Sequence, residues 1–263
     1  AREMSEAEIK EWLQGVVGRC DAAMEKIMSN NDPSHDELHV HRVRRLAMAI
    51  AAKEVKGPFL DTWFSLLVIE IAALFHDVND WKYGDAGEPE SISRLIEEAL
   101  DGSSPAWLTG DHSLAELVRQ VTYVCDFISF SKELSPGYPT ELPIELRVVQ
   151  DADRLEAIGA LGICRCFTYG ARKNRKFYNE HSVTRAKAHI ASENTDSVCT
   201  ELKQEDYMKA DREADTISHF DEKLFKLMGM MKTDTGKKIA ESRHRFMKQF
   251  TDQFYTEVLC LDV

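Results

Sequence analysis

Apolar residues recur along this chain at the spacing of amphipathic helices. Between residues 5 and 30 they return every three or four positions, which places them on one face of a helix. The same repeat predicts helices over about 33–55, 61–77, 89–100, 114–130 and 144–169, and two closing helices after residue 217. No segment alternates apolar and polar residues between turn signals, as a half-buried strand does. The pattern therefore predicts an all-α fold.

The start of the second helix carries two alternative signals. Asp32 is placed to cap the helix with Pro33 in the first helical position, and Ser34 with Glu37 offers a capping box instead. Both alternatives begin the helix just before His39. Either start leaves His39 inside the first turns of the helix.

The chain is predicted to form one domain over residues 1–263. A length of 263 residues suffices to bury a core, and 43% hydrophobic with 30% charged residues is typical of globular proteins. The segment at about 179–216 is rich in Glu, Asp, Lys and Thr, with weak apolar periodicity, and is predicted to be a polar surface excursion. The aromatic residues of the two closing helices fit a homodimer contact or packing within the core equally well.

Charge and composition limit the classes of molecule that the protein is expected to bind. A net charge of -12 argues against binding to a nucleic-acid polymer, but a small anionic substrate needs only a local group of cations. The longest apolar run, residues 63–75, is shorter than the roughly 20 residues that span a bilayer, and the first residues lack the pattern of a signal peptide. The six cysteines show no repeated spacing, which is typical of reduced thiols. We therefore expect a cytoplasmic protein without membrane contact.

Two histidines and an aspartate interrupt predicted buried helices. His39 shares a helix face with Val43 and Ala47, so its imidazole points inward. His76 and Asp77 stand in the last turn of the apolar helix over 61–77. Burying an ionised carboxylate costs several kcal/mol unless it is paired or binds a metal. A core hydrogen bond for His39 and a cap or salt bridge for Asp77 are the ordinary alternatives to a metal site.

A third group of polar residues, Asp151, Asp153 and Arg154, interrupts the helix predicted over 144–169. Residues two apart point about 200° away from each other on a helix, so only one of the two aspartates can face the same site. Each of them shares a face with apolar residues. Periodicity therefore leaves the choice between Asp151 and Asp153 open.

Helices that each present His or Asp inward are typical of a metal site inside a helical bundle. Two imidazoles and two carboxylates suit one divalent ion of Mn, Fe, Co, Ni or Zn, and suit Mg less well. Four protein ligands leave an octahedral ion with positions for water and for a phosphate oxygen. The donor set therefore predicts a single catalytic metal.

The segments around these residues, HDELHVHRV, ALFHDVNDWK and VQDADRLEAIGALG, resemble the H…HD…D signature of the HD-domain phosphohydrolases. They are similar in particular to the YedJ-like branch, and the resemblance extends to ISFSK at 128–132, YGARKNRKFY at 169–178 and HFDEKLFKL at 219–227. It implies metal ligation by His39, His76, Asp77 and Asp153, with Asp151 as a neighbour. The excursion is longer than we expect in bacterial relatives, which weakens the transfer of a substrate from them.

The resemblance also implies a reaction, the hydrolysis of a phosphoester or phosphoanhydride bond, with nucleotides as the favoured substrate. Asp80, three residues past Asp77, is predicted to orient or deprotonate the attacking water. Phosphate oxygens need cationic partners. The predicted catalytic cations are Lys82, Arg42 and Arg154, and the predicted substrate-binding cations are Lys132, Arg172 and Arg175. His35 and Asp36 are expected to orient neighbouring groups, although Asp36 fits a first-turn helix charge equally well.

Two other functions have to be weighed. Some HD relatives hold two irons and oxygenate their substrates, which requires extra histidines between the HD pair and the last aspartate, where only His112 occurs. A metal-stabilised scaffold without activity is less favoured, because all four ligands and Asp80 are present. The sequence therefore favours a mononuclear metal-dependent phosphohydrolase.

Overall fold

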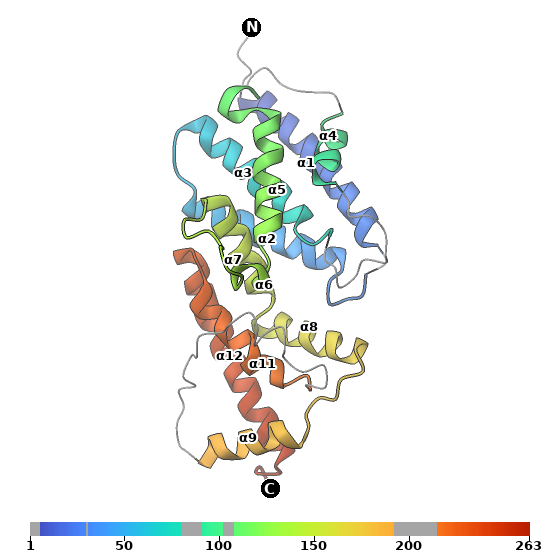
Figure 1. Ribbon diagram of the computed structural model, residues 1–263, viewed down its shortest axis with the longest axis vertical. Helices are drawn as coiled ribbons and strands as arrows, with labels where there is room; N and C mark the ends of the chain where they lie inside the picture. The colour runs from blue at the N-terminus through green and yellow to red at the C-terminus, as the bar shows by residue number, and fades with distance from the viewer. Residues whose placement is uncertain (1–5, 30, 80–90, 102–107, 192–214) are drawn as a thin grey trace. The chain divides into compact units, whose positions relative to one another are not determined.

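The computed structural model describes residues 6–29, 31–79, 91–101, 108–191 and 215–263, and these residues form helices and turns without any strand (Figure 1). The predicted all-α fold is confirmed. The chain divides into two compact units, residues 1–133 with 138–152 and residues 134–137 with 153–263. Helix α7 (Ile144–Glu156) runs unbroken through the boundary at residues 152 and 153, and the prediction of one domain stays a prediction.

The first unit is built around an apolar helix, α3 (Phe59–Phe75), which packs against α1 (Glu6–Met28), α2 (Glu37–Glu54) and α5 (Leu114–Phe127). The second half of α3 is almost entirely buried, so it is the core of this unit. The remaining elements are α4 (Ile92–Leu100), the 3₁₀ turn η1 (Gly110–His112), α6 (Phe130–Glu133) and the greater part of α7 (Ile144–Glu156). No described helix combines the length and the apolar character that crossing a membrane requires.

Helix α2 begins later than either predicted cap. Its N-cap is Asp36, whose side chain accepts a hydrogen bond from the backbone N–H of His39 at 2.9 Å. The predictions with Asp32 or Ser34 as the cap are wrong, because Asp32 Oδ1 accepts hydrogen bonds from both the backbone N–H and the hydroxyl of Ser34 and so closes a turn ahead of the helix. Asp36, predicted either to orient neighbouring groups or to be a first-turn charge, is the N-cap residue that precedes the first turn.

The second unit contains α8 (Gly159–Arg172), α9 (Glu180–Ala191), α11 (Ser218–Glu222), the 3₁₀ segment η2 (Leu224–Met230) and α12 (Asp234–Val258). The start of the predicted polar excursion, residues 179–216, forms helix α9. Residues 192–214 of the excursion lie outside the described residues. The first predicted closing helix is a short helix followed by η2. Aromatic rings of α8, α11 and α12 pack on one another, with Phe220 stacked on Phe250 at 5.9 Å.

The single helix predicted over 144–169 is wrong, because α7 ends at Glu156 and α8 begins at Gly159. Gly159 has φ +78°, in the left-handed region that a residue with a side chain enters at a cost. A methyl group there would also lie 3.0 Å from Cγ of Arg243. The apolar repeat continues across this break, so periodicity alone does not reveal it.

Gly159→Ala is therefore expected to lower the free energy of unfolding by about 1–3 kcal/mol, since the new methyl group meets backbone strain and the Arg243 side chain together. Chemical denaturation followed by circular dichroism measures the change. Gly229→Ala is the matched control, because a methyl group at Gly229 meets nothing within 4 Å. Equal destabilisation by both substitutions would contradict this account of the break.

Candidate metal centre

Two neighbouring helices bring two imidazole rings together. His39 lies in the first turn of α2 and is fully buried, and His76 is the C-cap residue of α3. The two ring centroids are 5.4 Å apart with the planes at 73°. The hydrogen bond from the His39 N–H to Asp36 fixes the start of α2. Because α2 packs along α3, the two histidines are held by the core and not by a loop.

His76 is oriented by its own helix. Its Nδ1 lies 2.8 Å from the carbonyl oxygen of Ala73, and a carbonyl can only accept, so Nδ1 carries the proton. In the neutral ring the lone pair is then on Nε2. A ring nitrogen fixed in this way by a hydrogen bond at the other nitrogen is the usual arrangement of a metal-ligating histidine.

Asp77 faces both rings. Its Oδ2 lies 3.4 Å from Nε2 of His39 and 3.4 Å from Nε2 of His76. Burial raises the pKa of this carboxyl, but the His76 and His39 rings, when they are protonated, outweigh burial and hold the pKa well below its ordinary value. Asp77 is therefore ionised near neutral pH, as a metal ligand must be.

Asp153, on α7, completes the group. Donor atoms of His39, His76 and Asp153 all lie within 4.8 Å of one another. Asp151 is fully buried and is not a member of this group. Asp153, the aspartate that the family resemblance implies, is therefore the one that lies near the two histidines, and its role as a metal ligand stays a prediction.

These residues fit a divalent metal ion. The two histidine rings and the carboxylates of Asp77 and Asp153 provide the mixed nitrogen and oxygen donor set that first-row divalent ions prefer. Asp77 is not part of the group of three, but its Oδ2 lies 3.4 Å from Nε2 of both histidines. Thiols are not needed, and Cys125, whose Sγ lies 3.9 Å from the Ala72 carbonyl, has a pKa raised above its ordinary range by burial.

The predicted cations have different surroundings. Arg42 is half-buried on α2, three residues after His39 and therefore on the same side of the helix. Arg154 is buried, and its Nη1 donates to the carbonyl oxygen of Met230 at 3.0 Å. The exposed Lys132 holds its ammonium group 5.8 Å from the centre of the Phe127 ring.

Arg172 and Arg175 lie at the end of α8 and just beyond it, in the second unit. Arg172 is exposed, and the Arg175 guanidinium lies 6.0 Å from the centre of the Tyr169 ring. Asp80 and Lys82 lie outside the described residues. The catalytic and substrate-binding roles assigned to these residues stay predictions.

His112 is held far from the two histidines. Its Nε2 lies 2.8 Å from Oδ1 of Asp61, in the first turn of α3, whereas His76 ends that helix. Fifteen residues of helix separate the two ends by about 22 Å. The extra histidine that the diiron alternative would need is therefore not at this centre.

Sequence reasoning missed two supporting contacts. The Ala73 carbonyl orients His76, and it could have been found from its position three residues earlier on the same helix. Gln150 is fully buried, and its amide donates to the Ile128 carbonyl at 3.2 Å and to the Tyr138 hydroxyl at 3.0 Å. The hydrogen bond to Ile128 links the turn before α6 to α7, close to Asp153. A polar residue in an apolar run was the available signal.

Comparison with known proteins places the chain among helical proteins of similar length. No family model matches it. It is 29% identical over 264 residues to the uncharacterised protein YpgQ of Bacillus subtilis, covering 99% of this chain and 98% of YpgQ. The crystal structure of YpgQ in complex with ADP superposes with a TM-score of 0.62 at 26% identity, covering 96% of this chain and 100% of that one.

Two further crystal structures are similar. A Lactobacillus plantarum protein has a TM-score of 0.65 at 28% identity, covering 93% of this chain and 97% of its own. A protein of Bacillus thuringiensis described as an HD-superfamily hydrolase has a TM-score of 0.57 at 27% identity, with the same coverage of 93% and 97%. Each of these similarities covers at least 93% of this chain and so extends over both units.

Proposed function

We propose that this chain, which is similar to an HD-superfamily hydrolase and to YpgQ, is a metal-dependent hydrolase that cleaves a phosphoester or phosphoanhydride bond of a nucleotide. The observation that carries the proposal is the convergence of donor atoms from His39, His76, Asp77 and Asp153. A divalent ion held there would supply charge neutralisation for a phosphate oxygen and would make a nearby water more acidic. Mn²⁺ is our first candidate for that ion, since the mixed donor set suits it.

The protein residues have separate tasks in this proposal. His39 and His76 would hold the ion through Nε2, with Asp36 and the Ala73 carbonyl fixing their positions. Asp77 would stay ionised beside them, because a neighbouring cation favours the charged form of a carboxyl. Asp153 would complete the ligand set. The site would therefore be formed before substrate arrives, which reduces the reorganisation that catalysis requires.

Substrate phosphates would be bound by side chains near the ion. Arg42, on the same side of α2 as His39, is placed to meet a phosphate, and a guanidinium can contact two phosphate oxygens at once. Asp80 follows Asp77 by three residues, and we assign it the task of orienting or deprotonating the attacking water. Lys82, Lys132, Arg154, Arg172 and Arg175 are further candidate cations.

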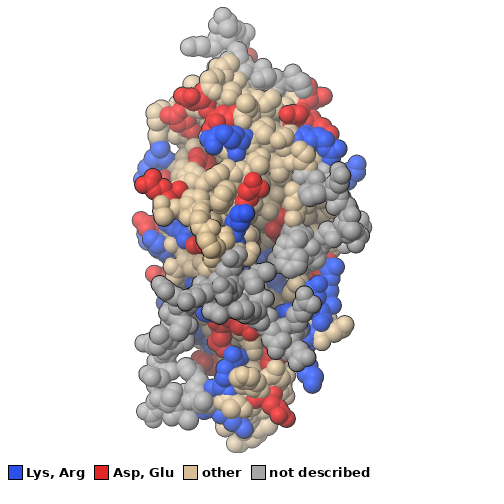
Figure 2. Space-filling model, in the orientation of Figure 1, with Lys and Arg blue, Asp and Glu red and all other residues tan. Residues whose placement is uncertain are grey.

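Two observations support a nucleotide as the substrate. The similar protein YpgQ was crystallised with ADP, so a nucleotide binds a protein of this architecture. On the face drawn in Figure 2, acidic and basic side chains are interspersed, and a net charge of -12 disfavours polymeric nucleic acid. A mononucleotide needs only the local cations of a site.

A substrate panel tests the proposal and identifies the bond. Protein freed of metal and then loaded with Mn²⁺ is incubated with nucleoside mono-, di- and triphosphates, and released phosphate and pyrophosphate are measured separately. Phosphate released from monophosphates would identify cleavage of a phosphomonoester bond. Pyrophosphate released from triphosphates would identify cleavage of a phosphoanhydride bond. The same protein kept in EDTA is the control. Absence of both products from the loaded protein across the panel would contradict the proposal.

A further inference from the structure

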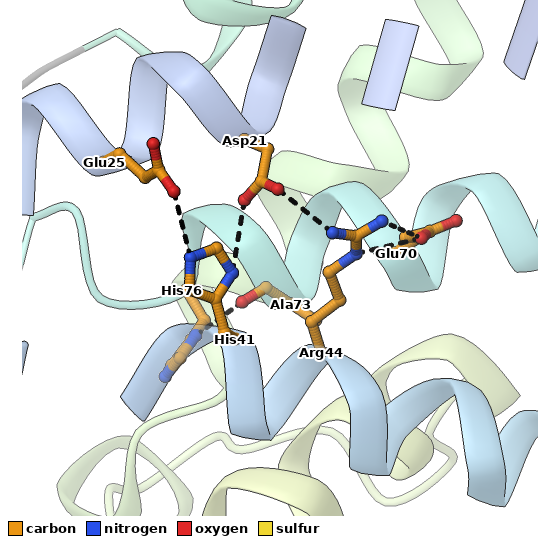
Figure 3. Close-up of polar contacts among 7 residues, drawn as sticks. All are labelled: Asp21, Glu25, His41, Arg44, Glu70, Ala73 and His76. Carbon is orange, nitrogen blue, oxygen red and sulfur yellow. Dashed lines mark hydrogen bonds and ion pairs between the residues drawn. The ribbon is translucent and has the colours of Figure 1, made fainter. Parts of the chain in front are cut away.

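A second group of metal-binding residue types lies away from the proposed catalytic centre, between α1 and α2. Asp21 and Glu25 are four residues apart on one face of α1, and His41 projects toward them from α2 (Figure 3). We call these three residues the α1–α2 cluster. His41 follows His39 by two residues, so its side chain points about 200° away from the proposed catalytic centre.

The imidazole of His41 stands between the two carboxylates. Its Nδ1 lies 3.4 Å from Oδ1 of Asp21, and its Nε2 lies 3.2 Å from Oε1 of Glu25. One donor atom from each residue lies within 4.8 Å of the other two. Ligands bonded to one tetrahedral Zn²⁺ at its usual bond lengths are about 3.4 Å apart. The cluster is therefore close to the size of an ion site, and the exposed Glu25 can turn to share one ring nitrogen with Asp21.

One carboxylate oxygen of the cluster is buried without a hydrogen bond. Oδ2 of Asp21 receives Nη1 of Arg44 at 3.2 Å, but Oδ1 is buried, and no group in the described part of the chain donates a hydrogen bond to it. This oxygen faces the His41 ring, whose Nδ1 lies 3.4 Å away. A buried carboxylate oxygen lacking a donor is costly unless a cation meets it, so this atom points to a ligand that the protein residues do not provide.

The local charge favours the same ligand. Arg44 binds Asp21 and, through Nε and Nη2 at 2.9 and 2.7 Å, Oε1 of Glu70 on α3. Three carboxylates, those of Asp21, Glu25 and Glu70, thus face one guanidinium. With His41 neutral the surroundings carry two net negative charges, which a divalent cation would balance.

We propose that Asp21, Glu25 and His41 form a second divalent-cation site, of a kind that suits Zn²⁺, which fastens α1 to α2. Helix α1 packs mainly on α3 and α4, so an ion bridging to α2 would add a link that the apolar contacts provide only weakly. The site is structural or regulatory and does not depend on the proposed hydrolysis. His41 and Glu70 belong to the same helices as His39 and His76, so an ion there would also brace the helices that carry the two histidines.

Counting bound ions tests this inference. Metal-free protein is equilibrated against Zn²⁺ alone, and zinc per chain is measured after dialysis for the wild type, Glu25→Gln, His41→Gln and the control His181→Gln. His181 is an exposed histidine of α9 whose loss should not matter. We expect two ions per chain in the wild type and the control, and one in Glu25→Gln and His41→Gln, with at least a tenfold loss of affinity at the second site.

A thermal melt of the same samples gives a second readout. Zinc should raise the melting temperature of the wild type and of His181→Gln more than that of the two cluster variants, because a ligand stabilises only the state that binds it. Glu25 has a side chain 55% exposed, so Glu25→Gln should fold normally, and the melt of its metal-free form checks this. A zinc count that is the same in the wild type and in both cluster variants would overturn the inference. A lack of hydrolysis would leave this count unchanged.

Discussion

Asp77→Ala is expected to lower kcat for nucleotide hydrolysis by about a thousandfold or more in the presence of Mn²⁺, because the variant loses the carboxylate that lies between both imidazoles. Steady-state turnover at saturating metal measures the loss. Far-UV circular dichroism of the same preparation shows whether the helices are retained. A fall in turnover with an unchanged spectrum places the effect at the metal centre.

Asp111→Ala is the control for this experiment, since it removes an exposed aspartate of η1 in the same unit. Its turnover should equal that of the wild type. If Asp77→Ala lowered the melting temperature but kept full turnover, the centre would be a stabilising scaffold and the catalytic proposal would be wrong. Equal losses in both variants would show that the assay responds to folding alone.

Asp153→Asn and Asp151→Asn are expected to have opposite consequences. The Asp153 carboxylate belongs to the group formed with His39 and His76, so its amide variant should bind Mn²⁺ at least about tenfold more weakly and lose most turnover. Asp151 is fully buried outside that group, so Asp151→Asn should keep its metal and lower the free energy of unfolding by about 1–3 kcal/mol. Metal titration and chemical denaturation of both variants measure these effects.

The two substitutions remove the same charge from the same helix, so each is the matched control of the other. Loss of metal from Asp151→Asn with retention by Asp153→Asn would reverse our assignment of the two aspartates. Loss of metal from both would indicate that the orientation of α7, more than either carboxylate, determines binding.

Most of the helices could be predicted from the sequence because their apolar faces are long. The ranges for α1, α3 and α5 follow from periodicity, since each helix buries one regular face or, for α3, nearly its whole surface. The start of α2 was misplaced because Asp32, Ser34 and Asp36 all have capping side chains, and only the turn formed by Asp32 shows which one is used. The helical spacing of apolar residues does not show which of several capping side chains forms the hydrogen bond.

The break between α7 and α8 was missed for a related reason. Gly159 lies in a run whose apolar residues continue at helical spacing, and the residue that a methyl group there would meet, Arg243, is distant in sequence. A glycine inside a helical pattern is compatible with either a continuous helix or a break. Periodicity therefore carried no information about this turn.

In the candidate site, too, some features follow from the local sequence pattern and others depend on tertiary packing. The inward direction of His39 and the buried position of His76 follow from the pattern, and the structure brings both rings together. The choice of Asp153 over Asp151 required the family resemblance, because both residues share faces with apolar neighbours. The bond from Arg154 to Met230 joins residues 76 apart in the chain, and such contacts depend on tertiary packing that no local pattern encodes.

Anomalous diffraction from crystals grown with Mn²⁺ tests the central claim most directly. We predict one strong peak within bonding distance of His39 Nε2, His76 Nε2 and the carboxylates of Asp77 and Asp153, and its disappearance in crystals of Asp77→Ala. A peak bound by other residues, or no peak at these four in a protein that hydrolyses nucleotides with Mn²⁺, would contradict the account.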